Sequence, residues 1–234
     1  MSALPIAAPS LSALPPLRYA DRLGLPNIIR VDVSFEEYLE FAEQCDYRVE
    51  YSNRQLVSMG QPTDTHEFLV MNAGYVLKAV LRGKGAYKVY GSNLGILIQE
   101  TMAHYKPDVT LLLGEPERVF HKVNKRTLRS VVNLYAVVEV FSKGTMDYDI
   151  FEKLPNYKKC PTMRYAIFID QYQHFVSVYT RSDDNPKVWL NIDYYDLEDA
   201  FLLDGHTIRL KDIYEDINLE IAVPKPSKGN GKTS

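Results

Sequence analysis

The chain has 234 residues, of which 46% are hydrophobic and 24% charged, an ordinary balance for a protein with one sizeable core. Its 27 basic and 30 acidic residues leave a formal charge of -3, so the net charge does not attract nucleic acid and any basic contact surface must be local. Two widely spaced cysteines, Cys45 and Cys160, argue against a disulfide framework and indicate free thiols in a reducing compartment. The sequence has neither an apolar run of membrane-spanning length nor a secretion signal, so we expect a cytoplasmic protein with no membrane partner.

Composition divides the chain into three parts. Residues 1–28 are rich in Pro and Ala without a period, and residues 223–234 are polar with Gly and Pro, so both are expected to be flexible. Residues 29–222 are expected to form a single domain, in which we find no internal repeat.

The first elements expected in this domain are a helix, a hairpin and a second helix. Ser34 is a typical N-cap for a helix over 34–45, where acidic residues occupy the first turn. Two alternating segments over 47–59 flank a polar turn and predict a β-hairpin. Apolar residues at helical spacing over 63–82, followed by Gly83, predict the second helix.

The remaining pattern predicts mainly strands. They are expected near 86–90, 94–99, 108–113, 131–141, 164–170 and 175–180, with a helical stretch at roughly 147–159 and, after Trp189, a strand or two and a short helix around 196–203. The expected fold is therefore α/β, with a mixed central sheet flanked by helices.

One of these strands contains an unexpected acid. Glu139 interrupts an apolar run formed by Val137, Val138, Val140 and Phe141. Burying a carboxylate is costly unless it is paired, protonated or bound to a metal. An edge strand with one face in solvent would explain Glu139 equally well.

Two further acids raise the same question. Asp108 follows Pro107 and directly precedes an apolar strand, and Glu50 lies in the hairpin. If Asp108 and Glu139 occupy neighbouring strands, about 4.8 Å apart, their side chains can converge on one cation. Mg²⁺ accepts one or two carboxylates and keeps water and substrate phosphate in its other positions, and the Val140 carbonyl could add a ligand.

A lysine follows these acids on the predicted helix. Lys153 stands four residues after Asp149, so the two share a helix face. An ammonium beside a bound metal could hold or help deprotonate an attacking water and offset charge on a phosphodiester transition state. Taken singly, Asp108 is an ordinary strand-entry acid, Glu50 a hairpin surface residue and Lys153 a solvated helix lysine.

The order of these residues resembles the Uma-two family of putative restriction endonucleases, in the PD-(D/E)XK nuclease superfamily. The similarity runs from about Ser34 to Thr180. It rests on Glu50, Pro107, Asp108, Glu139, Ser142, Thr145, Asp149, Lys153 and Tyr157.

The resemblance implies a role for each residue. Asp108 and Glu139 would be the metal-binding acids, Glu50 a helper acid and Lys153 the catalytic lysine, with Asp149 and Tyr157 in support. Phe141 stands where the standard motif has its lysine, so the lysine would have moved to the helix. Lys143 and Gly144 replace the family's usual Pro and Ser, and Ile150 its usual Arg. His66 is given no catalytic role.

The implied function is a Mg²⁺-dependent DNA endonuclease that hydrolyses phosphodiesters with a metal-activated water, with Mn²⁺ as a possible substitute. By resemblance it would act as a homodimer. The alternatives are a catalytically silent binding or assembly module of the same fold and a hydrolase of small phosphoesters. The best candidates for a local DNA contact are Lys122, Lys125, Arg126 and Arg129, although such a run is usually a solvated loop or helix face.

Overall fold

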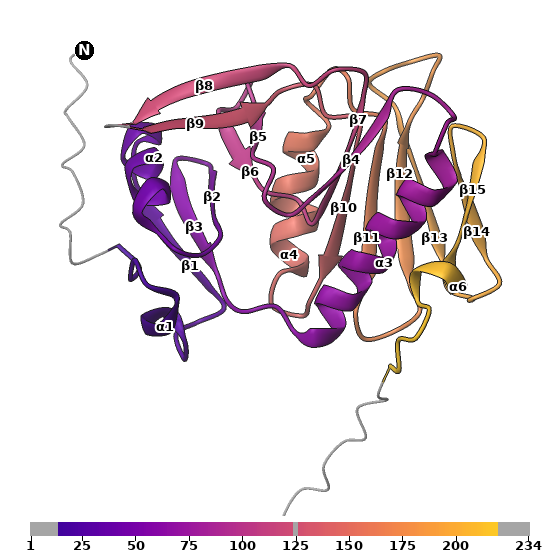
Figure 1. Ribbon diagram of the computed structural model, residues 1–234, viewed down its shortest axis with the longest axis horizontal. Helices are drawn as coiled ribbons and strands as arrows, with labels where there is room; N and C mark the ends of the chain where they lie inside the picture. Colours follow the sequence, from indigo (N-terminus) through magenta and orange to yellow (C-terminus); the bar gives the residue numbers. More distant parts are fainter. Residues whose placement is uncertain (1–13, 124–125, 220–234) are drawn as a thin grey trace, which may run out of the picture.

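The computed structural model describes residues 14–123 and 126–219 of the chain. Helices and strands mix in an α/β arrangement with two large sheets (Figure 1), which confirms the predicted fold class. Cys45 and Cys160 are free thiols, as expected.

The N-terminal part forms one large sheet with the strand order β1-β3-β2-β6-β5-β9-β8. The short helix α1 (Tyr19–Arg22) precedes it, and α2 (Phe35–Gln44) begins with a capping box between Ser34 and Glu37. Its strands are β1 (Ile28–Asp32), β2 (Val49–Ser52), β3 (Gln55–Met59), β5 (Ile96–Ile98), β6 (Ala103–Tyr105), β8 (Arg118–Val123) and β9 (Arg126–Val131).

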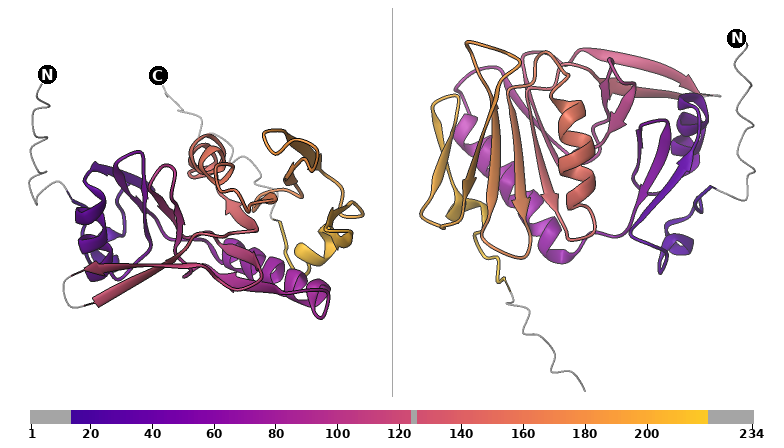
Figure 2. Two further views of the ribbon diagram at one scale, coloured as in Figure 1. Left: turned by 90° about the horizontal axis from the view of Figure 1, so that it is seen from above. Right: turned by 180° about the vertical axis from the view of Figure 1, so that it is seen from behind.

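The second large sheet has the order β13-β12-β11-β10-β7-β4, in which β10 and β11 are parallel. Its strands are β4 (Tyr87–Gly91), β7 (Val109–Leu113), β10 (Ala136–Phe141), β11 (Tyr165–Asp170), β12 (Val176–Arg181) and β13 (Trp189–Tyr194). Helix α3 (Asp64–Leu81) covers one face. The other face carries a continuous helix made of α4 (Met146–Tyr148), the π-helical turn η2 (Asp149–Lys153) and α5 (Leu154–Tyr157); Figure 2 shows the two helices on opposite sides.

Alternation along β10 decides where its acid points. Ala136, Val138 and Val140 belong to the core beneath α3, whereas Val137 and Phe141 belong to the core beneath α4 and α5. Because successive side chains point to opposite faces, Glu139 faces the helix made of α4, η2 and α5. The strand is central and Glu139 is buried, so the edge-strand explanation is wrong.

Several expected boundaries differ. The strand predicted over 131–141 is β10, which begins only at Ala136. Strands β1, β6, β8 and β9 were not expected. Lys122 and Arg129 lie on the antiparallel strands β8 and β9 rather than in a loop or on a helix face.

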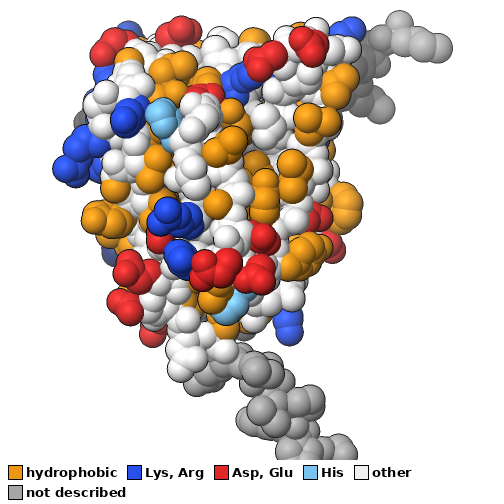
Figure 3. Space-filling model, turned by 90° about the vertical axis from the view of Figure 1, so that its right-hand side faces the viewer, with side chains coloured by type: hydrophobic (Ala, Val, Ile, Leu, Met, Phe, Trp, Pro, Cys, Tyr) orange, Lys and Arg blue, Asp and Glu red, His pale blue; other side chains and the backbone are white. Residues whose placement is uncertain are grey.

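The short helix expected around 196–203 is also wrong. Ala200–Leu203 is strand β14, which pairs with β15 (His206–Arg209), and the short helix α6 (Leu210–Ile213) follows. Asp204 and Gly205 both have positive φ angles, as a two-residue type I′ turn requires, and this Asp-Gly pair was the signal for a hairpin. On the face that carries this hairpin, hydrophobic and charged side chains are interspersed (Figure 3).

Asp204 also joins the small hairpin to the second large sheet. The hydroxyl groups of Tyr87, Tyr135 and Tyr165 all donate to its carboxylate, at 2.5–3.0 Å.

We expect Asp204→Ala to lower the free energy of unfolding by about 3 kcal/mol, because three partly buried hydroxyl groups lose their acceptor. The exposed Asp184 is the matched control, and Asp184→Ala should stay within about 0.5 kcal/mol of wild type. Equal urea midpoints for the two variants would contradict this role.

Candidate functional site

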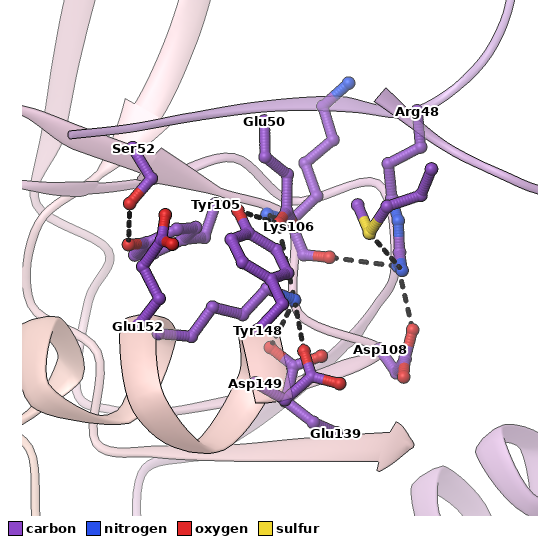
Figure 4. A network of polar contacts seen from close by, with 12 residues as sticks. Arg48, Glu50, Ser52, Tyr105, Lys106, Asp108, Glu139, Tyr148, Asp149 and Glu152 are labelled. Carbon is purple, nitrogen blue, oxygen red and sulfur yellow. Dashed lines mark hydrogen bonds and ion pairs between the residues drawn. The ribbon is translucent and has the colours of Figure 1, made fainter. Parts of the chain in front are cut away.

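Three of the predicted acids surround the ammonium group of a fourth site residue, Lys153. Lys153 Nζ lies 3.1 Å from Glu139 Oε1, 3.1 Å from Asp149 Oδ1 and 3.3 Å from Glu50 Oε2. Figure 4 shows the carboxylates of Glu139 and Asp149 pointing toward this nitrogen. The side chains of all four residues are at most 5% exposed, so the charges are held away from solvent.

Each layer of the fold contributes to this cluster. Glu50 lies on β2 of the first sheet and Glu139 on β10 of the second. Asp108 immediately precedes β7, whose ladder with β10 ends at the pair Val138 and Val109, so Asp108 and Glu139 come next in register. Asp149 and Lys153 are the first and last residues of η2. In this turn the Leu154 N–H donates to the Asp149 carbonyl, a π-helical bond of a kind that is frequent at functional sites.

Tyrosine hydroxyl groups hold two of the acids. Tyr157 donates to Glu139 Oε1 at 2.6 Å, and Tyr148 donates to Glu50 Oε2 at 3.0 Å. The Lys106 amide donates to Glu50 Oε1 at 2.9 Å. Both oxygens of Glu50 are therefore engaged, whereas no hydrogen bond from the described residues reaches Glu139 Oε2.

Asp108 lies beside this group and has its own partners. Arg48 Nη1 donates to Oδ1 at 2.7 Å, the Val140 N–H donates to Oδ2 at 2.9 Å, and His66 Nε2 lies 3.2 Å from Oδ2. Sequence reasoning missed Arg48, although its position two residues before Glu50 places both side chains on one face of the strand. It also gave no role to His66, which the first turn of α3 brings to Asp108.

Burial and mutual repulsion shift the pKa values of the cluster. The pKa of the Glu139 carboxyl is raised to about 8, because its burial and the nearby Asp108 and Asp149 outweigh the opposing effect of Lys153. Burial likewise raises the pKa of Asp149. Burial would raise the pKa of Asp108 too, but Arg48 and His66 lower it overall. Although burial disfavours the ammonium, the surrounding acids hold the pKa of Lys153 well above its usual value.

A cleft of about 560 Å³ opens onto this centre. Asp108, Glu139, Val140 and Asp149 line it, whereas Glu50 and Lys153 lie behind them and are not lining residues. The wall also carries polar side chains that can donate or accept hydrogen bonds, among them Asn27, Gln61, Thr63, Ser92, Asn93, Ser142 and Thr145. Asp108, Glu139 and Asp149 therefore border the cleft, whereas Glu50 and Lys153 do not.

The donor set fits a hard divalent cation. The centre has four carboxylates, those of Glu50, Asp108, Glu139 and Asp149, against the two cations of Arg48 and Lys153, so full ionisation leaves two negative charges in excess. Carboxylate oxygens are ligands that Mg²⁺ prefers. No group of three or more His, Cys, Asp or Glu side chains within the described residues forms a ready metal cage, so an ion here would rely on one or two carboxylates and water.

Of the residues predicted to contact DNA, Lys122 and Arg129 are not part of this centre. Lys122 and Arg129 are exposed on β8 and β9, and Arg126 begins β9. Lys125 and the side chain of Arg126 lie outside the described residues.

Similarity to known proteins was found at three levels. A family model described as "Putative restriction endonuclease", Uma2, matches residues 35–222. Two Synechocystis proteins, "Uncharacterized protein sll1609" and "Uncharacterized protein slr1290", are each 25% identical to this chain, over 154 and 162 residues. These matches cover 66% and 69% of this chain, and 82% and 80% of the relatives.

A solved structure shares the fold. It is the crystal structure of a "putative nuclease belonging to DUF820" from Anabaena variabilis, with a TM-score of 0.57 at 13% identity over 76% of this chain and 96% of that one. Within the described residues, no helix is both long and apolar enough to cross a membrane. Since the family model spans most of the chain, including every residue of the buried centre, the chain belongs to the Uma2 family of putative restriction endonucleases.

Proposed function

We propose that the chain is a Mg²⁺-dependent DNA endonuclease of the cytoplasm that hydrolyses phosphodiester bonds in the cleft above Asp108 and Glu139. The observation that carries this proposal is the excess of buried carboxylates facing an open cleft, with an ammonium held directly behind them. A bound Mg²⁺ would supply an activated water and neutralise charge on the phosphate. Asp108, Glu139 and the Val140 carbonyl are its proposed ligands.

The residues around the metal position take different roles. Lys153 remains protonated because its pKa is raised, so it acts as a fixed positive charge rather than as a base, and stabilises the negative charge of the transition state. Glu50 and Asp149 fix the position of its ammonium. Tyr157 orients Glu139 through Oε1, while Oε2 receives no hydrogen bond from the described residues.

Incubation with supercoiled plasmid tests the proposal. We expect nicked or linear product with Mg²⁺ or Mn²⁺ and none with EDTA. Without a bound ion, the negative charges of the carboxylates would repel the phosphate of the DNA. Asp108→Asn, which keeps the shape of the side chain, should remove the activity. Intact plasmid under all metal conditions, with protein shown to be folded by circular dichroism, would reject the endonuclease.

A silent binding or assembly module is the second candidate, and one observation favours it. Both oxygens of Asp108 already have partners, in Arg48, His66 and the Val140 amide, so this acid is satisfied without an ion. Calorimetric titration with Mn²⁺ separates the candidates, since a silent module would show no binding that depends on Asp108. Homodimerisation stays a prediction, and cutting both strands would require two such centres.

A further inference from the structure

The outer face of the β8–β9 hairpin carries a compact set of cations around an aromatic ring. The register pairs Phe120 with Arg129 and Lys122 with Thr127, so the side chains of Arg118, Phe120, Lys122, Thr127 and Arg129 project from one face. We call this set the hairpin face. The opposite side is fixed to the protein, since Val123 and Leu128 pack in the core formed with α2. The hairpin face is thus held in place by its own buried side.

These cations are available to a ligand. Within the described residues, Arg118, Lys122 and Arg129 form no ion pair, and the hairpin face contains no acid. Two exposed acids precede β8: Glu115 is paired with Lys88 and also interacts electrostatically with Arg118, and Glu117 stands directly before Arg118. The Phe120 ring is 58% exposed, with Arg118 and Lys122 on either side along β8 and Arg129 opposite on β9. An exposed aromatic ring among unpaired cations is typical of surfaces on which nucleic-acid bases stack.

A second hollow lies beside this face and shares one lining residue with the cleft of the acidic centre. It has a volume of about 420 Å³ and is lined by Arg118, Thr127 and Arg129 together with Tyr90, Asn93 and Leu94. Asn93 also lines the cleft above Asp108 and Glu139. The turn between β4 and β5 therefore borders both hollows.

We propose that the hairpin face and its hollow bind a single-stranded stretch of nucleic acid whose phosphates contact Arg118 and Arg129 and one of whose bases stacks on Phe120. A base inside a duplex has both faces covered by its neighbours, so only an unpaired base can use this ring. The inference rests on the proposed function in one respect, that the strand continues past Asn93 to the acids. Binding itself needs no metal and no cleavage.

Fluorescence anisotropy in EDTA tests the stacking. The probes are labelled oligo(dT) of about 20 nucleotides and a blunt duplex of the same length. Phe120→Leu should weaken oligo(dT) binding about tenfold and leave duplex binding unchanged, because Leu keeps the apolar volume but not the aromatic face. Phe68→Leu on α3, whose ring is 57% exposed, is the matched control and should bind both probes as wild type does.

The cations are tested by salt dependence. The double variant Arg118→Gln and Arg129→Gln should reduce the slope of log affinity against log salt for oligo(dT) by about 1.4, the value for two phosphate contacts. Lys187→Gln, at an exposed position that forms no ion pair with the described part of the chain, is the control. The proposal is overturned if Phe120→Leu binds oligo(dT) like wild type, if it weakens duplex binding equally, or if the slope is unchanged. Because no metal is present, these outcomes are independent of whether plasmid is cleaved.

Discussion

Glu139→Gln is expected to abolish divalent-ion binding and DNA cleavage together while the protein stays folded. The amide keeps the shape and can still accept from Tyr157 and Lys153, but it removes the charge that would hold the ion. Because burial already raises the pKa of the Glu139 carboxyl to about 8, an uncharged side chain suits this position. The free energy of unfolding near pH 7 should therefore change little, which urea unfolding measures. Calorimetric titration with Mn²⁺ measures the loss of ion binding.

The pH dependence of the wild-type protein provides the control. A carboxyl whose pKa is raised to about 8 is mostly protonated below that pH, and an ion must displace the proton. Mn²⁺ affinity should then rise by up to about tenfold per pH unit between roughly pH 6 and 8, and level off above. Full Mn²⁺ affinity in Glu139→Gln would remove Glu139 from the metal site.

Lys153→Met is expected to reduce cleavage on the order of 100-fold or more, because the transition state loses its fixed positive charge. From the sequence alone, metal and DNA affinity should change little. The structure adds a cost in stability, since Glu50, Glu139 and Asp149 would be left buried without their shared cation. Breaking such a buried group typically costs about 3–5 kcal/mol. Plasmid cleavage must therefore be measured at a temperature where circular dichroism shows the variant to be folded.

A second substitution separates stability from chemistry. In Lys153→Met with Glu50→Gln, one of the unpaired acids is neutralised, so part of the lost stability should return while cleavage stays low. Glu50 lies behind the lining residues of the cleft, which makes it a suitable partner for this purpose. Recovery of cleavage along with stability would mean that Lys153 serves only to hold the fold, and Lys143 in the preceding turn would be the next cation to test.

Local sequence patterns predicted the helix and strands that hold Lys153 and its acids, because helices and strands depend on the short-range spacing of residues. The four-residue interval between Asp149 and Lys153 brought the two side chains together even though the helix takes a π turn there. What the sequence could not supply was the approach of the two sheets, which depends on long-range packing. That approach places Glu50 beside Lys153.

Other elements were missed for identifiable reasons. The segment that forms β8 and β9 contains so many charged residues that the alternation of apolar and polar positions is hard to recognise in the sequence. Pairing of β9 with β5 and packing on α2 stabilise the two strands in the folded protein. The two side chains that contact Asp108 come from the residue just before β2 and from α3, both far from Asp108 in sequence, so no short interval along the chain points to Arg48 or His66.

The position of Glu50 has a mechanical consequence. This acid belongs to one large sheet, and the lysine it pairs with is on the helix packed against the other. The ion pair between Glu50 and Lys153 therefore also links the two halves of the protein, each built on one sheet. Any movement that draws the halves apart removes an anion from Lys153 and changes the charge balance next to Glu139. A nucleic-acid strand that pulls on the β8–β9 hairpin, which belongs to the same sheet as Glu50, would thus change the charge balance next to Glu139 without contacting it.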